Sequence, residues 1–185
     1  MATDPDAILV GADSHVYVAP VGTSPGTDPA VALSATWKEV GYTARDGIEV
    51  TPSEETTDVE AAQDMYAPRI ITTGRALEIA FTMLEWNDVT LPLAFGGGAI
   101  VTATGVSTYN PPQAQASDLR ALALEWADGA KKYRFVVVRS RVTTQGSFNV
   151  GPTAAAVLPI TLRALGAGQS LPFYLMSNDP ALVAA

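Results

Sequence analysis

The sequence predicts a single, mainly β domain of the sandwich or barrel type. Thirteen prolines and fifteen glycines imply many turns, as in an all-β protein. Short segments that alternate apolar and polar side chains recur along the chain, and only one segment has helical character. At 185 residues, of which 48% are hydrophobic, the chain can bury the core of one domain. We therefore expect one domain over residues 1–185, in which residues 1–13 form a flexible N-terminal arm.

Three strands are predicted before residue 53. His15–Pro20 forms the first, and the turn-rich residues Gly22–Ala30 follow it. Trp37–Thr43 and Gly47–Pro52 both alternate with period two, and Asp46–Gly47 marks a turn between them.

The next segment, Ser53–Asp64, is acidic and contains no large apolar side chain except Val59. Because it cannot bury itself, we expect it to leave the body as a long loop or hairpin and to return through Tyr66–Thr73. This predicts an acidic arm over residues 53–73.

The middle of the chain contains a half-buried strand and then a short helix. Arg75–Glu85 places four large apolar side chains on one face: Leu77, Ile79, Phe81 and Met83. Asn87–Phe95 is the helix candidate, with Asn87 or Thr90 as its cap and Gly96 as its end. Ala99–Tyr109 is predicted to be a strand, and Pro111–Ser117 a loop.

A hairpin over Asp118–Val142 is the strongest local prediction, with its turn centred on Asp128–Gly129. Counting outward from that turn pairs Leu124 with Tyr133 on an apolar face and Glu125 with Lys132 on the other. Two further strands follow, Ala155–Leu165, in which Pro159 favours an edge or a bulge, and Pro172–Met176.

Charge is separated along the chain, whose net charge is −8. Seven acids and no base lie between Asp46 and Asp64, whereas six bases and one acid follow Gly129. Such separation suits copies that meet head to tail. The candidate contact residues between subunits are the acids Glu54, Glu55, Asp58, Glu60 and Asp64 and the bases Lys131, Lys132, Arg134, Arg139 and Arg141. Which acids line any channel is left open.

Little in the sequence indicates catalysis or a cofactor. There is no cysteine, and His15 is the only histidine. Gly96–Gly98 follows a helix and precedes a strand, the reverse of the order in phosphate-binding loops. We therefore predict no enzyme, no metal site and no cofactor. The acidic balance argues against wrapping nucleic acid, and no apolar stretch is long enough for a membrane helix.

Six segments of the chain, in the order in which they occur, resemble the major tail proteins of long, non-contractile-tailed bacteriophages, and in particular those of actinobacterial phages. They are VYVAPVGT (16–23), TWKEVGYTARDGIEV (36–50), LEWNDVTLPLAFGGG (84–98), ALEWADGAKKYRFVVVRSRV (121–142), PITLRAL (159–165) and PFYLMSNDP (172–180).

This resemblance implies a tail-tube β-sandwich with one flanking helix and a long loop that reaches a neighbour. It also implies hexameric rings stacked into a tube, around a tape-measure protein and bounded by tail terminator and tip proteins. Such a tube is a virion component, assembled in the host cytoplasm, through which DNA passes without specific binding. The alternative from another class is a monomeric or trimeric β-sandwich that binds a surface or a carbohydrate.

Overall fold

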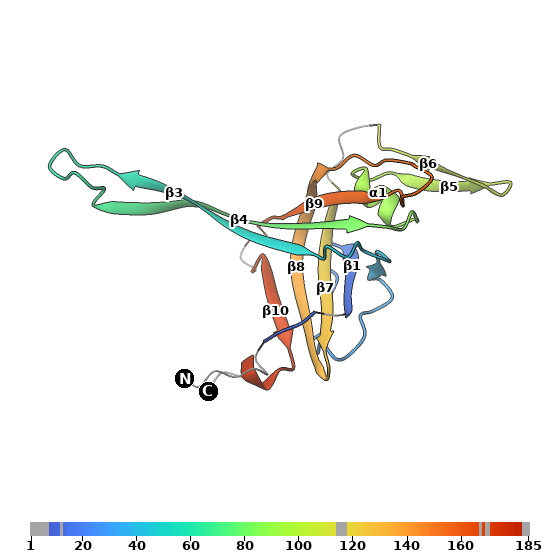
Figure 1. Cartoon of the computed structure of the whole chain (residues 1–185), viewed down its shortest axis with the longest axis horizontal. Helices are drawn as coiled ribbons and strands as arrows, with labels where there is room; N and C mark the ends of the chain where they lie inside the picture. Colours follow the sequence, from blue (N-terminus) through green and yellow to red (C-terminus); the bar gives the residue numbers. More distant parts are fainter. Residues whose placement is uncertain (1–7, 12, 114–117, 167, 169–170, 183–185) are drawn as a thin grey trace.

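The structure is a computed structural model that describes residues 8–11, 13–113, 118–166, 168 and 171–182. Most of the flexible arm expected over residues 1–13, and the end of the loop expected over 111–117, lie outside the described residues. One eight-stranded antiparallel sheet dominates the fold (Figure 1). Its main path runs β2 (Lys38–Glu39), β1 (Asp13–Pro20), β7 (Leu119–Asp128), β8 (Lys131–Gln145), β9 (Leu158–Ala164), β4 (Arg69–Met83) and β3 (Glu49–Val59), and β10 (Phe173–Ser177) pairs with the first half of β8.

The sheet curls until the segment after β2 joins its two ends. The backbone N–H of Val40 donates to Val16 on β1, and that of Ala44 donates to Thr82 on β4, both at 2.9 Å. Thr43 also forms an isolated bridge with Met83. This closure confirms the expected β-sandwich or barrel.

The core lies inside the curled sheet. Leu77, Ile79, Phe81 and Met83 are at most 5% exposed, so the predicted half-buried strand is confirmed. They pack with the apolar face of the other strands, formed by Val16, Val18, Leu122, Leu124, Val137, Ile160 and Leu162. Alternation with period two is the reason that one face of each strand is buried.

A long β-hairpin projects from this body. It is formed by β3 and the first part of β4, and it extends to the left in Figure 1. Every residue of β3 is exposed, because the segment lacks the large apolar side chains that a core would bury. A bulge between Glu55 and Thr56 bends the hairpin midway. We call residues 53–73 of this hairpin the arm.

One prediction about strands is wrong. Ala99–Tyr109 is not one strand but a hairpin of β5 (Ala99–Ala103) and β6 (Val106–Asn110), because Thr104 and Gly105 both adopt positive φ and reverse the chain. The turn predicted between Trp37–Thr43 and Gly47–Pro52 is confirmed, since the Gly47 N–H donates to the Ala44 oxygen at 3.1 Å. The first segment bonds β1 and reaches β4 at Thr43, and the second pairs with β4.

The predicted register of the β7–β8 hairpin is also wrong, by two residues. Its two-residue loop is Gly129–Ala130, so Asp128 pairs with Lys131 and Glu125 pairs with Arg134 rather than Lys132. A shift of two preserves the face of every side chain. The apolar set therefore still points into the core, although each cross-strand partner changes.

The described residues contain one α-helix, α1 (Thr90–Ala94), and a 3-10 turn over Pro180–Leu182. The α-helix is shorter than predicted and begins after Val89, but Asn87 bonds the backbone at its start, as expected. The Asn87 Oδ1 accepts from the N–H groups of Val89 and Thr90, each at 2.9 Å, and Gly96 adopts a φ of 75° just after the helix. Pro159 lies on an interior strand, not an edge. The bulge that accompanies it is in β8, between Val142 and Thr144.

Candidate assembly surfaces

Three of the predicted contact acids lie on β3 within the arm, and one of them is already bonded to other residues of the arm. Glu54 accepts a hydrogen bond from the Thr72 hydroxyl at 2.6 Å and faces Arg75 at 3.4 Å. The Thr72 hydroxyl, with Arg75 beside it, holds the pKa of the Glu54 carboxyl below its usual range. Glu55 and Asp58 are exposed on the same strand, opposite Gly74 and Ile70.

The arm is less acidic than its sequence segment suggests. The returning strand brings Arg69 and Arg75 beside the acids, so residues 46–75 have a net charge of −5 rather than the −7 of residues 46–64. Glu60 and Asp64 lie in the connection between the two strands and are exposed. The acids are therefore distributed along the hairpin and interleaved with arginine.

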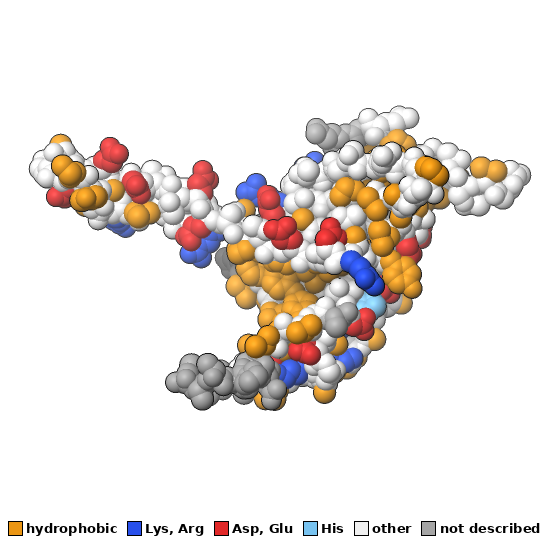
Figure 2. Space-filling model, in the orientation of Figure 1, with side chains coloured by type: hydrophobic (Ala, Val, Ile, Leu, Met, Phe, Trp, Pro, Cys, Tyr) orange, Lys and Arg blue, Asp and Glu red, His pale blue; other side chains and the backbone are white. Residues whose placement is uncertain are grey.

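Besides Glu60 and Asp64, the outer end of the arm exposes large apolar side chains, which the sequence interpretation missed. Met65, Tyr66 and Ile70 are 95%, 84% and 64% exposed, and Val59 and Ile71 are 41% and 42% exposed. Figure 2 shows orange side chains gathered at the end of the hairpin, with red ones among them and along its length. The sequence signal that could have revealed this surface is the presence of large apolar residues within a segment predicted to be exposed. We call Val59, Met65, Tyr66, Ile70 and Ile71 the arm tip.

The basic candidates do not form one patch. Lys131 and Lys132 lie at the β7–β8 turn, where they hold the C-terminal segment. Lys131 Nζ is 3.4 Å from Asp179, and the backbone N–H of Lys132 donates to Asn178 Oδ1 at 2.7 Å. The Tyr133 hydroxyl donates to Asp179 at 2.5 Å, and this contact raises the pKa of Tyr133 to about 12.

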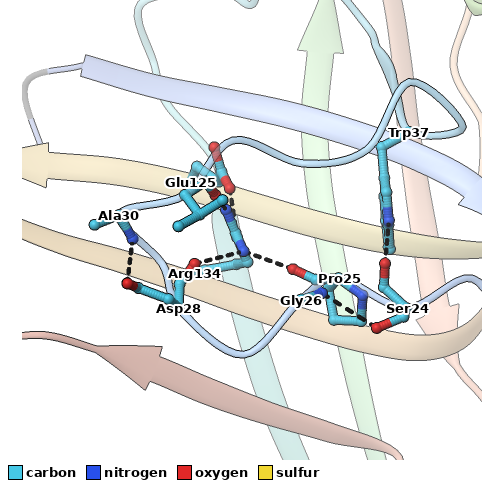
Figure 3. Close-up of polar contacts among 9 residues, drawn as sticks. Ser24, Pro25, Gly26, Asp28, Ala30, Trp37, Glu125 and Arg134 are labelled. Carbon is cyan, nitrogen blue, oxygen red and sulfur yellow. Dashed lines mark hydrogen bonds and ion pairs between the residues drawn. The ribbon is translucent and has the colours of Figure 1, made fainter.

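Arg134 is not a surface residue, which corrects its selection as a contact candidate. Its side chain is 1% exposed and is ion-paired with Glu125. Its guanidinium donates to the backbone oxygens of Pro25, Asp28 and Val31, at 2.6, 3.2 and 2.6 Å (Figure 3). Arg134 therefore fixes the loop over residues 24–31 to the sheet.

Arg141 is exposed and lies directly opposite Arg163 on the neighbouring strand. Like charges in this position repel each other unless an acid lies between them. Among the residues that the structure describes, neither guanidinium has a carboxylate within 4.0 Å, although Glu78 is the register partner of Arg163. Arg139 is half-buried two residues earlier on β8. Arg141 and Arg163 form the basic site that is open to a partner.

Strand edges offer a further means of contact. In the described part of the chain, no strand pairs with the outer edge of β3 or with the outer edge of β10. Along these two edges, the backbone N–H and C=O groups have no strand partner among the described residues. Open edges of this kind pair readily with another chain.

The groups considered for chemistry do not form a reactive site. His15 lies between Glu39, at 2.6 Å, and Asp13, at 3.1 Å, on the surface of β1. Within the described residues, no cluster of three His, Cys, Asp or Glu side chains is arranged to hold a metal ion. The described helices include none that could span a membrane.

Comparison with known proteins agrees with this architecture. The family model described as phage tail tube protein matches residues 1–185. The chain is 26% identical over 198 residues to the major tail protein Gp23 of Mycobacterium phage D29, covering 97% of this chain and 95% of that protein.

The fold is similar to one in the sheath–tube complex of the extracellular contractile injection system PVC in its extended state. The TM-score is 0.55 at 10% identity, with 95% of this chain and 99% of that chain covered. A chain of the virion of a native gene transfer agent gives a TM-score of 0.45 at 11% identity, with 86% and 96% covered. With its curled β body, single short helix and match over its whole length, this chain belongs to the phage tail tube protein family, whose members are virion structural proteins and not enzymes.

Proposed function

We propose that this protein assembles into hexameric rings that stack as the tube of a phage tail, the conduit for genome ejection. The observation that supports this most strongly is the arm. Fifteen-residue β4 and eleven-residue β3 build a hairpin whose outer half pairs with no other strand among the described residues and yet exposes large apolar side chains. Monomeric proteins seldom maintain such a surface without a partner to cover it.

Head-to-tail association follows from where the complementary features lie. The arm leaves one side of the body, whereas α1 and the β5–β6 hairpin lie on the other (Figure 1). A contact between two different surfaces of identical chains is heterologous, and such contacts generate closed rings or helical filaments. In a tube of stacked rings, subunits repeat around each closed ring and also along the axis of the tube.

Charge supports a role for the arm at the subunit contact. Glu55 and Asp58 are exposed carboxylates, and Arg141 and Arg163 are exposed guanidiniums without an acid of their own in the described structure. We place the arm of one copy over these arginines of the next. Lys131, Lys132 and Arg139 are secondary candidates, since the first two already bond the C-terminal segment.

The net charge of −8 suits a conduit for DNA, because an anionic wall does not retain phosphates. In this proposal, the rings surround a tape-measure protein during assembly in the host cytoplasm and are capped by terminator and tip proteins. DNA then passes without specific binding.

Negative-stain electron microscopy of the purified chain over a range of concentrations tests the proposal. Rings with six-fold symmetry or tubes are expected. A variant in which a two-residue Asn-Gly turn replaces residues 54–75 removes the arm, since Ser53 and Ala76 are register partners that such a turn can join. It should stay folded by circular dichroism and form no tubes. If the complete chain remains a compact monomer at every concentration, the proposal is wrong.

A further inference from the structure

The structure contains an apolar groove on the side of the body away from the arm. It lies where the end of α1 meets the ends of β8 and β9, has a volume of about 470 Å³, and is lined by Phe95, Phe148, Leu158 and Pro159. Phe148 projects from the irregular residues that connect β8 to β9. We call this feature the aromatic groove.

Aromatic side chains frame the groove and remain partly open to solvent. Phe148 makes an edge contact with Trp86, with ring centroids 5.0 Å apart, and another with Phe95 at 6.4 Å. Trp86, Phe95 and Phe148 are 43%, 39% and 44% exposed. Together they form an unfilled apolar surface with a depression at its centre, the form that suits an inserted side chain.

None of the residues that line the groove is charged. No Asp, Glu, Lys or Arg occurs in residues 89–117, which include the helix and the β5–β6 hairpin, or in residues 142–162, which include the connection from β8 to β9. Figure 2 accordingly shows neither red nor blue on the β5–β6 hairpin. An uncharged apolar groove selects an apolar ligand rather than a carboxylate.

We infer that the aromatic groove binds the arm tip of a second copy of this chain. The arm tip is the matching apolar projection, with Met65 and Tyr66 more exposed than most side chains of the protein. A methionine sulfur packs favourably against aromatic rings, and a tyrosine buries a large apolar area while its hydroxyl stays solvated. The inference rests on the proposed assembly and names the surface that receives the arm.

Geometry excludes the same chain as occupant. The arm extends away from the body on the side opposite α1 (Figure 1), and the end of α1 lines the groove, so one molecule cannot fill its own groove. The contact is therefore made between copies.

Cross-linking tests the inference cleanly, because the chain has no cysteine of its own. The double variant Gln63→Cys with Ser147→Cys should give a ladder of covalent multimers on mild oxidation of assembled protein, and reduction should abolish it. Each single variant should stop at dimers, since a ladder requires two different sites per chain. Gln63 and Ser147 are both exposed, and the pair leaves the apolar side chains of the arm tip and of the groove in place.

The matched control is Gln63→Cys with Lys132→Cys, at the basic turn. A ladder from this pair and not from the groove pair would overturn the inference in favour of docking at the lysines, while tubes seen by microscopy would leave the proposed function intact. Absence of rings and tubes from the unsubstituted chain would instead refute the proposed function.

A second measurement does not depend on cross-linking. Met65→Ser with Tyr66→Ser should raise the critical concentration for assembly by about tenfold or more, since two large apolar side chains lose their burial. Phe148→Ser should act in the same direction. The control Glu60→Gln with Asp64→Asn should change it by less than about twofold, because exposed charges contribute little. If the charge variant raised the critical concentration more than the apolar variants, charge pairing rather than the groove would hold the arm tip.

Discussion

Arg134 and Glu125 face each other across the β7–β8 register as an ion pair, and the guanidinium of Arg134 is almost completely buried. The remaining N–H groups of the guanidinium donate to three backbone oxygens of the loop over residues 24–31. A buried charge is stable only when it is paired and hydrogen-bonded in this way. The pair therefore anchors a long loop that has little regular structure.

Arg134→Ala should destabilise the protein by about 3–5 kcal/mol, because it leaves the Glu125 carboxylate and three carbonyls without their donor. For a chain of this size, the corresponding fall in Tm is about 6–20 °C. Thermal unfolding followed by circular dichroism measures it, with Lys132→Ala as the control on the next exposed base, expected to be within about 0.5 kcal/mol of the parent. Equal effects of the two substitutions would contradict the role assigned to Arg134.

The sequence shows why Arg134 was mistaken for a contact residue. The alternation of Arg134 with Tyr133 and Phe135 correctly places Arg134 on the face opposite to theirs. The burial of Arg134, however, depends on the loop over residues 24–31, which folds back across that face of the sheet. That approach is a long-range event that local pattern does not encode. The same holds for the closure of the sheet through Val40 and Ala44.

Local patterns predicted the features that depend on neighbouring residues. The apolar face of β4 and the capping of α1 by Asn87 follow from periodicity and from a side chain beside its own helix. The division of residues 99–109 by Thr104 was missed, because Thr-Gly is a weaker turn signal than Asn-Gly. The aromatic groove was beyond reach, since it combines α1, β8 and β9.

Tyr133 should be the last tyrosine of the chain to ionise. The Asp179 carboxylate accepts its hydrogen bond and raises the pKa of Tyr133 to about 12. Since the folded-state pKa is raised, this stabilisation is present in full below about pH 10 and is lost as the pH rises towards 12. Absorbance titration of tyrosinate should lose its most alkaline component in Tyr133→Phe. In Asp179→Asn the Tyr133 pKa should fall towards 10, and an unchanged titration in both variants would contradict the assignment.

His15 should titrate above its ordinary value. The hydrogen bond that the Glu39 carboxylate accepts from the ring, assisted by the charge of Asp13, raises the pKa of the His15 imidazole against the opposing effect of partial burial. The link that it makes between β1 and β2 is therefore strongest below about pH 6.5 and weakens as the pH rises through the raised value. As His15 is the only histidine, its ring proton gives a single NMR titration curve. The midpoint should move down in Glu39→Gln, and a midpoint that stays in place would contradict the bridge.

Gly41 should be less tolerant of alanine than Gly22. Both adopt a φ near +90°, where an L side chain is strained by about 1–2 kcal/mol. A Cβ at Gly22 would meet nothing within 4 Å, whereas one at Gly41 would lie 2.5 Å from the Glu85 carboxyl group, whose Oε1 accepts from the Tyr42 N–H at 3.0 Å. Gly22→Ala thus measures strain alone, and Gly41→Ala adds displacement of Glu85 from the segment that closes the sheet. Denaturant unfolding should show the larger loss for Gly41→Ala; equal losses would mean that the Glu85 contact contributes nothing to the closure.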